Sequence, residues 1–489
     1  MEEESVVYVF SDWTQKLLID GRRVDALSGR TFDTVDPSTG NIIAKIAEAD
    51  ASDVDMAVRS ARKAFEGDWG RMRANERGLL LLKLAELIRR DEDELVSLES
   101  LDSGKPVSAI RRQDLPAVID TLVYYAGMAD KINGQVIPAR QDALTYTVRE
   151  PLGVVGAIVP WNFPLMIGMW KIAPALACGC TVVLKPAEIT PLTALKIGEL
   201  ALEAGLPAGT LNVVPGFGRI AGQAIVDHPD IDKVTFTGSP TVGRQILQGA
   251  AGNLKRVTLE LGGKSANIIF PDADLDAAVK AAAAGIFFNT GQVCSAGSRI
   301  LAHESVYDEV VERLAARAST VRIGDPRDSS TGMGPLVSEV QMNRVLDYID
   351  IGRKEGARLV AGGNRHGERG FYVEPTVFAG VEHEMRISQE EIFGPVATVI
   401  SFKDEDDALR IANGTVYSLA AGVWTADIGR AHRFTRRLKA GTVWVNTYGP
   451  TDIRLPWGGT RDSGFGREHG EEAIENFTEP KAVWINTGR

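Results

Sequence analysis

Two blocks in which strand patterns alternate with helix patterns predict an α/β protein built on parallel sheets. In the first block, helical segments separate β-rich runs at 154–159, 181–184, 211–214, 234–236 and 266–269. The second block begins near residue 272, with helical patterns at 307–318, 341–355 and 404–413 and a strand pattern at 396–402. Strands that alternate with helices form parallel sheets covered on both faces. With 489 residues, the chain is long enough for two doubly wound domains.

Other segments predict how these sheets are covered and extended. Residues 51–131 show mainly amphipathic helix patterns, including a leucine face at 77–90. Thr190 and Pro191 predict an N-cap and a first helical position, and Gly205 predicts the end of that helix. The β-prone runs 145–149 and 481–486 lie apart from both blocks. An unpaired strand edge of this kind favours contact with a partner subunit.

Composition and charge restrict the partners and the location of the protein. The net charge is −11, whereas nucleic-acid and anionic-membrane surfaces need clustered Lys and Arg. Residues 151–170 carry no formal charge, but Pro151, Pro160 and Pro164 would break a membrane helix there. The acidic start Met1–Glu4 is unlike a secretory signal, and the low cysteine count fits a reducing compartment. We therefore expect a cytoplasmic protein with small-molecule partners.

The three cysteines differ in their settings. Cys178 and Cys180 have no further ligands at metal-binding spacing, so we expect them to pack in a core and predict no metal site. Cys294 lies in the polar, glycine-marked turn 289–295, between a helical run and a strand pattern. Such a loop favours partial exposure, a lowered pKa and attack on a carbonyl carbon, although a lone cysteine is by default a small buried residue. Glu260, where a strand enters a Gly-Gly turn, is a candidate base.

Three further turns carry candidate binding groups. Lys185 and Glu188 follow a strand and can grip a ribose at the carboxyl edge of a sheet, but they are also typical of solvated loop charges. The turn 237–244 opens a helix and suits a pyrophosphate. The glycine run 216–222 is a weaker match to a dinucleotide fingerprint, because its last glycine comes one place late. Asn162, between two prolines, is a candidate oxyanion donor, with helix capping as the alternative.

Together these segments resemble the NAD(P)-dependent aldehyde dehydrogenase superfamily over about residues 32–483. The matching motifs, in the family's order, are Pro160-Trp161-Asn162-Phe163-Pro164, Lys185-Pro186-Ala187-Glu188, Phe236-Thr237-Gly238-Ser239, Glu260-Leu261-Gly262-Gly263-Lys264, Gly291-Gln292-Val293-Cys294 and Glu390-Glu391-Ile392-Phe393-Gly394-Pro395. The resemblance implies a dinucleotide-binding domain at 1–131 and 151–262, a catalytic domain at 263–462, and a small β oligomerisation segment at 132–150 and 478–489. It also implies a homodimer or a homotetramer.

The resemblance implies a covalent mechanism. Cys294 would attack the aldehyde, while the Asn162 side chain and the Cys294 backbone N–H hold the oxyanion. After hydride transfer to the nicotinamide, water activated by Glu260 would hydrolyse the thioester to the carboxylic acid. Because Glu260 is present, hydrolysis is favoured over acyl transfer to coenzyme A. Lys171 and Glu468 match positions proposed to relay protons from Glu260 to solvent.

The family pattern also implies an NAD site. Lys185 and Glu188 would hold the adenosine ribose, and Glu391 the nicotinamide ribose, with Phe393 beside it. A carboxylate at Glu188 would repel a 2′-phosphate, so NAD is preferred, although some relatives accept NADP as well. The remaining predicted cofactor contacts are Trp161, Gly218, Phe236, Gly238, Ser239, Val242 and Leu261.

The aldehyde tunnel mapped from the family is mostly apolar. Its predicted lining is Ile167, Trp170, Phe288, Val293, Ser295, Thr451, Arg454 and Trp457. Arg454 stands where relatives that oxidise dicarboxylic semialdehydes carry an arginine, which favours a carboxylate-bearing substrate; a surface pair with Asp452 is the alternative. Trp170 and Trp457 suit a quaternary ammonium, as in betaine-aldehyde enzymes, or form plain walls for a broad range of aliphatic and aromatic aldehydes.

Two other classes of function compete with this prediction. A cofactor-free thiol esterase would use Cys294 and Glu260 but leave the ribose and phosphate motifs idle. A structural protein could keep the fold but would need neither a nucleophile nor a base. The leading prediction is therefore the oxidation of an aldehyde with NAD.

Overall fold

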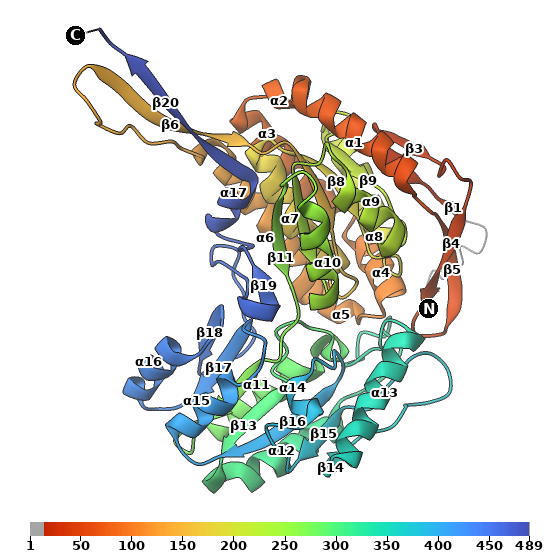
Figure 1. Ribbon diagram of the computed structural model, residues 1–489. Helices are drawn as coiled ribbons and strands as arrows, with labels where there is room; N and C mark the ends of the chain where they lie inside the picture. Colours follow the sequence, from red (N-terminus) through yellow and green to blue (C-terminus); the bar gives the residue numbers. More distant parts are fainter. Residues whose placement is uncertain (1–13, 489) are drawn as a thin grey trace.

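A computed structural model describes residues 14–488 of the chain (Figure 1). The acidic start Met1–Glu4 and the outer ends of the predicted segments 1–131 and 478–489 lie outside this range.

The first sheet has eight strands in the order β19-β11-β10-β7-β8-β9-β2-β3. Its parallel centre consists of β11 (Arg256–Glu260), β10 (Lys233–Thr237), β7 (Val154–Ile158), β8 (Thr181–Lys185) and β9 (Leu211–Val213). Antiparallel strands extend it at both edges: β19 (Gly464–Phe465), β2 (Leu17–Ile19) and β3 (Arg22–Val24). Sequence patterning predicts the parallel centre but not the chain's late return through β19.

Helices cover both faces of the first sheet. Val155 and Val182 pack in one core cluster, whereas their neighbours Val154 and Val183 pack in another, because successive side chains of a strand point to opposite faces. The helices around this sheet are α1 (Ala51–Glu66), α2 (Asp68–Arg71), α3 (Ala74–Arg90), α4 (Glu92–Ser103), α5 (Val107–Ala109), η1 (Ile110–Asp114), α6 (Leu115–Met128), η2 (Ala129–Lys131), α7 (Pro164–Cys178), α8 (Leu192–Ala204), η3 (Gly218–Gly222), α9 (Gln223–Asp227), α10 (Pro240–Ala250) and α17 (Glu472–Phe477). The sheet is therefore doubly wound, as predicted.

The second sheet has seven strands in the order β14-β15-β16-β13-β12-β17-β18. They are β12 (Ala266–Ile269), β13 (Arg299–His303), β14 (Arg358–Ala361), β15 (Thr376–Ala379), β16 (Val396–Phe402), β17 (Ala420–Trp424) and β18 (Thr442–Val445), with only the β14–β15 pair antiparallel. Its connecting helices are α11 (Leu275–Phe287), η4 (Phe288–Gly291), η5 (Glu304–Val306), α12 (Tyr307–Thr320), α13 (Glu339–Lys354), α14 (Arg386–Gln389), α15 (Glu405–Asn413), α16 (Ile428–Arg437) and η6 (Arg461–Ser463).

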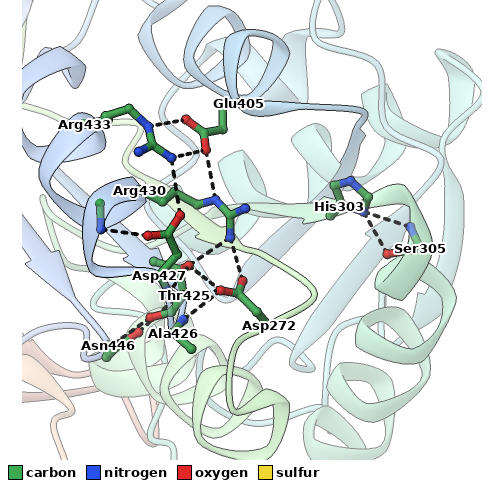
Figure 2. A network of polar contacts seen from close by, with 11 residues as sticks. Asp272, His303, Ser305, Glu405, Thr425, Ala426, Asp427, Arg430, Arg433 and Asn446 are labelled. Carbon is green, nitrogen blue, oxygen red and sulfur yellow. Dashed lines mark hydrogen bonds and ion pairs between the residues drawn. The ribbon is translucent and has the colours of Figure 1, made fainter.

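Charged side chains close the carboxyl edge of the second sheet, beyond β12 and β17. Figure 2 shows Arg430 between Asp272 and Glu405, with nitrogen–oxygen distances of 2.7 and 3.1 Å. Arg433 pairs with Glu405 at 2.6 Å, and Asp427 caps α16 through the N–H of Gly429. This edge is therefore occupied by its own ion pairs.

Two smaller sheets complete the fold. β6 (Ala143–Pro151) and β20 (Thr478–Asn486) form an antiparallel ladder that projects from the body of the molecule in Figure 1. It exposes Leu144, Trp484 and Ile485. The other sheet, in the order β1-β5-β4, contains β1 (Thr14–Gln15), β4 (Thr31–Asp36) and β5 (Asn41–Ala47).

The predicted start of α8 needs a correction. Pro191 occupies the N-cap position, and the Thr190 hydroxyl has no partner among the described residues. Instead, the N–H of Leu192 donates to the Asp102 carboxylate at 3.0 Å, and Asp102 is distant in the sequence. Gly205 ends the helix in a left-handed conformation, as predicted. Within residues 14–488, no helix is long and apolar enough to span a membrane, and no His, Cys, Asp and Glu cluster could hold a metal.

Candidate active site

Loops from the two sheets meet at one site. The carboxyl edge of the first sheet supplies Asn162 after β7, Lys185 at the end of β8 and Glu260 at the end of β11. The loops that precede β13 and β16 in the second sheet supply Cys294 and Glu391. Ligands of parallel sheets bind beyond the carboxyl ends of the strands. The topology therefore brings distant motifs of the sequence together.

Close backbone contacts hold this junction in place. The N–H of Gly263 bonds to the Glu391 carboxylate at 2.9 Å. A Cβ atom on Gly263 would lie 2.3 Å from the Cys294 carbonyl oxygen, and one on Gly262 would lie 2.2 Å from a Glu391 oxygen. Only glycine permits so close an approach, so the Gly-Gly turn after Glu260 is required by the packing.

The turn that carries Cys294 has a strained backbone. Asn289 and Thr290 have positive φ values of 47° and 56°. The Asn289 amide donates to the Asn162 backbone oxygen at 2.9 Å, and the Thr290 hydroxyl donates to the Gly334 oxygen at 3.0 Å. Strain of this kind persists only where surrounding bonds hold it. Sequence analysis missed the anchoring role of Asn289, although asparagine is one of the residues that tolerate left-handed backbone.

The Asn162 side chain points to the nucleophile turn. Its amide nitrogen donates to the backbone oxygen of Gln292 at 2.9 Å, and the residue is buried. The N-cap of α7 is Phe163, without a side-chain cap, so the helix-capping alternative is wrong. An amide group carries two N–H bonds, and among residues 14–488 this contact uses one of them.

The Cys294 thiol is protonated in the protein alone. Burial, together with the carboxyl groups of Glu260 and Glu391, raises its pKa to about 12. The residue is partly exposed, as predicted, but the predicted lowering of its pKa is wrong for the protein without ligands. Loop position indicates access, whereas the pKa depends on neighbouring carboxyl groups that are distant in the sequence.

Glu260 is the least satisfied carboxyl group at the site. It is buried, and its Oε1 atom has no partner among the described residues. Burial and the charge of Glu468 raise its pKa well above the usual range. A carboxyl group with a raised pKa is a stronger base once ionised.

Lys171 and Glu468 form a buried ion pair. Their charged atoms lie 2.6 Å apart, and Lys171 also donates to the Thr235 hydroxyl at 3.1 Å. Glu468 is held by a backbone exchange with Trp457, at 2.7 and 2.8 Å. The structure brings the two predicted relay residues together, and Thr235 is a partner that the sequence did not reveal.

The predicted ribose contacts are already paired. Lys185 Nζ lies 3.1 Å from Glu188 Oε2, and burial lowers the pKa of the lysine. Burial raises the pKa of Glu391 to about 7, while the N–H of Gly263 opposes this shift. Phe393, with φ of 61°, lies edge-on to Trp161 with ring centroids 5.1 Å apart. These contacts join two motifs that are distant in the sequence.

The predicted phosphate turn opens α10. The Ser239 hydroxyl accepts from the N–H of Val242 at 3.4 Å, and Val242 is exposed. The Phe236 ring lies directly under Gly238, and Leu261 packs under Gly243. The weaker glycine run forms η3, where a Cβ on Gly222 would lie 3.7 Å from the Lys185 side chain and Gly218 faces open space. The glycine run 216–222 therefore lies beside Lys185, and the turn 237–244 lies at the N-terminus of α10.

The predicted tunnel residues fall into two groups. Ile167, Trp170 and Trp457 are buried, with the two tryptophan rings 6.4 Å apart, and Phe288, Val293 and Ser295 are partly buried. Thr451 and Arg454 are exposed, and Arg454 bonds to both oxygens of Asp452, at 2.8 and 2.6 Å. Arg454 thus forms the surface pair with Asp452, which was the alternative to its contact with a substrate carboxylate.

Fold and site define an α/β protein in which a thiol, a buried carboxyl group and an amide donor adjoin a glycine-rich helix N-terminus. The family profile described as "Aldehyde dehydrogenase family" matches residues 24–483. Putative aldehyde dehydrogenase DhaS of Bacillus subtilis is 51% identical over 478 residues, covering 98% of this chain and 97% of that protein. An aldehyde dehydrogenase of Emericella nidulans is 52% identical, covering 96% and 95%.

A solved NAD⁺ complex of aldehyde dehydrogenase from Bacillus cereus has a TM-score of 0.97 and 49% identity, with 100% of this chain and 99% of that chain covered. The chain therefore belongs to the aldehyde dehydrogenase family, and the resemblance predicted from its motifs is confirmed.

Proposed function

We propose that this protein oxidises an aldehyde to a carboxylic acid with NAD, through a thioester on Cys294. The observation that carries this proposal is the junction of the Cys294 turn with Asn162 and Glu260. A nucleophile, an oxyanion donor and an unpaired base are the groups that this acyl chemistry needs.

Each residue has a distinct task in this mechanism. The Cys294 thiol releases its proton to water and its thiolate attacks the carbonyl carbon, while the Asn162 amide and the Cys294 backbone N–H hold the oxyanion. Glu260 accepts a proton from the water that hydrolyses the thioester, because its unpaired oxygen is free to bind that water. Lys171 and Glu468 would then pass this proton toward solvent along their buried contact.

The residues present suit NAD, which would accept the hydride from the substrate. The Lys185–Glu188 pair offers a cation and a carboxylate to one ribose, and Glu391 offers a second carboxylate. Ser239 and Gly238 stand at a helix N-terminus, which favours a pyrophosphate. Glu188 would repel a 2′-phosphate and so favours NAD over NADP. The NAD⁺ complex of the Bacillus cereus relative supports this assignment.

For the substrate, we favour an aldehyde with an apolar body. Trp170, Trp457 and Trp444 form consecutive ring contacts, with centroids 6.4 and 6.3 Å apart. A carboxylate-bearing semialdehyde is the second candidate, and it requires Arg454 to leave Asp452. A betaine-like aldehyde would instead place its cation on the tryptophan faces.

The same proposal extends to domains, assembly and location. We assign coenzyme binding to 1–131 and 151–262, catalysis to 263–462 and oligomerisation to 132–150 and 478–489. The apolar side chains exposed on the β6–β20 ladder support a homodimer or homotetramer. We place the protein in the cytoplasm.

The test compares two serine variants. NADH formation with a panel of neutral, cationic and anionic aldehydes should disappear in Cys294→Ser. It should persist in Cys180→Ser, because a serine hydroxyl can replace the thiol contact to the Phe477 oxygen. Activity retained in Cys294→Ser would overturn the covalent mechanism. Hydrolysis of an activated ester without any NADH formation would favour the thiol esterase, and NAD binding without either reaction would favour a structural protein.

A further inference from the structure

The Tyr448 hydroxyl bonds to the nucleophile turn one residue after Cys294. It donates to the backbone oxygen of Ser295 at 2.7 Å. Burial raises the pKa of Tyr448, so the hydroxyl stays protonated and keeps its role as a donor. Tyr448 follows β18, so this bond ties the turn to a segment about 150 residues away in the sequence.

The ring of Tyr448 is fixed by glycines on three sides. A Cβ atom added to Gly285 of α11 would lie 2.9 Å from a ring atom of Tyr448. The same distance would be 3.0 Å for Gly297 and 2.6 Å for Gly422 of β17. Real Cβ contacts are longer than these, so each position must remain a glycine for the ring to fit. The Trp444 ring packs on it as well, with centroids 4.7 Å apart. A side chain enclosed in this way holds its hydroxyl in one place.

The turn is held on both sides of the nucleophile. Before Cys294, the Asn289 and Thr290 side chains bind backbone oxygens of other segments. Directly after Cys294, the backbone oxygen of Ser295 accepts the hydrogen bond from the Tyr448 hydroxyl. Burial, Glu260 and Glu391 raise the pKa of the Cys294 thiol, and the backbone N–H groups of Ser295 and Cys294 oppose this shift. The Tyr448 bond therefore holds the backbone that immediately follows the nucleophile.

We propose that Tyr448 is a positioning residue for the nucleophile: its hydroxyl holds the Ser295 carbonyl and thereby fixes the backbone next to Cys294. The inference rests on the proposed function, because it assigns Tyr448 a role in the reactivity of Cys294. The hydroxyl acts through Ser295 and does not touch the aldehyde.

Tyr448→Phe tests this role because it removes the hydroxyl and keeps the ring. We expect the rate of Cys294 alkylation by iodoacetamide, followed by mass spectrometry across pH, to fall about tenfold below the thiol pKa. The decrease should be similar at every pH below the thiol pKa, because the loosened turn presents the sulfur less often in a reactive position while Glu260 and Glu391 are unchanged. With an aldehyde substrate, kcat should fall by a similar factor and the KM for NAD should stay the same.

Tyr307→Phe is the matched control. The Tyr307 hydroxyl also bonds to a backbone oxygen, that of Val399 at 3.3 Å, but it lies on α12. This variant should keep the wild-type alkylation profile and kcat. An unchanged alkylation rate below the thiol pKa in Tyr448→Phe, or an equal loss in Tyr307→Phe, would overturn the proposal. If the wild-type protein forms no NADH with any aldehyde, the proposed function fails, whereas the alkylation profiles still decide the role of Tyr448.

Discussion

The carboxyl edges of the two sheets have similar topology but opposite electrostatics. Beyond the second sheet, hydrogen bonds from Arg433 and Arg430 lower the pKa of Glu405 to about 2. At the first sheet, burial and a neighbouring carboxylate raise the pKa of Glu260 well above its usual range. One edge holds carboxylates that are ionised and paired (Figure 2), whereas at the other the Glu260 Oε1 atom has no hydrogen-bond partner among residues 14–488.

This difference favours the edge of the first sheet as the place of the proposed chemistry. Paired charges on a surface stabilise the fold and leave no group free for a ligand. An unpaired buried carboxyl group costs stability, and such groups cluster where binding or catalysis needs them. Equivalent positions in two similar sheets therefore divide into a structural edge and a candidate catalytic edge.

The largest expected effect is on Glu260. Glu260→Gln keeps the shape of the side chain but cannot accept a proton, so steady-state turnover should fall about a thousandfold. A burst of NADH should remain, because thioester formation precedes the step that needs the base. Stopped-flow measurement of NADH checks this. Loss of the burst together with turnover would assign Glu260 to the attack of Cys294 instead.

The pH dependence of hydrolysis should locate the Glu260 titration. The base must be ionised to act, and its pKa is raised, so the hydrolysis rate should increase with pH through a range well above ordinary carboxyl titration. Quenched-flow measurement of thioester decay from about pH 5 to about pH 9 covers this limb. The limb should disappear in Glu260→Gln; if it persists there, a titrating group other than Glu260 controls the rate.

Arg430→Ala should produce the reverse pattern at the second edge. It removes the bonds to Asp272 and Glu405, and we expect a loss of about 1 to 2 kcal/mol in the free energy of unfolding. Turnover should be unchanged, because this network lies apart from Cys294 and Glu260. Urea denaturation and the NADH assay measure the two quantities. A fall in kcat without a change in stability would contradict the assignment of a purely structural role to the edge of the second sheet.

The sequence predicts the fold and the site motifs much better than the state of the side chains. β-rich runs that alternate with helical patterns indicate the strands, and motif order indicates that Asn162, Glu260 and Cys294 belong together. The raised thiol pKa, the Asp102 bond at the start of α8 and the Tyr448 contact all depend on residues distant in the sequence. Local patterns contain no information about such partners, so these features required the structure.

Arg454 gives the smallest expected effect and the sharpest question about the substrate. Its guanidinium is exposed and already bonds both oxygens of Asp452, so Arg454→Ala should change the KM for a semialdehyde carboxylate by less than about threefold relative to a neutral aldehyde of equal length. Asp452→Asn is the informative partner, since it weakens that pairing and leaves the guanidinium in place. If the anionic aldehyde then binds better in Asp452→Asn, Asp452 has been screening the arginine. A rise above about tenfold in Arg454→Ala, confined to anionic aldehydes, would instead support the semialdehyde.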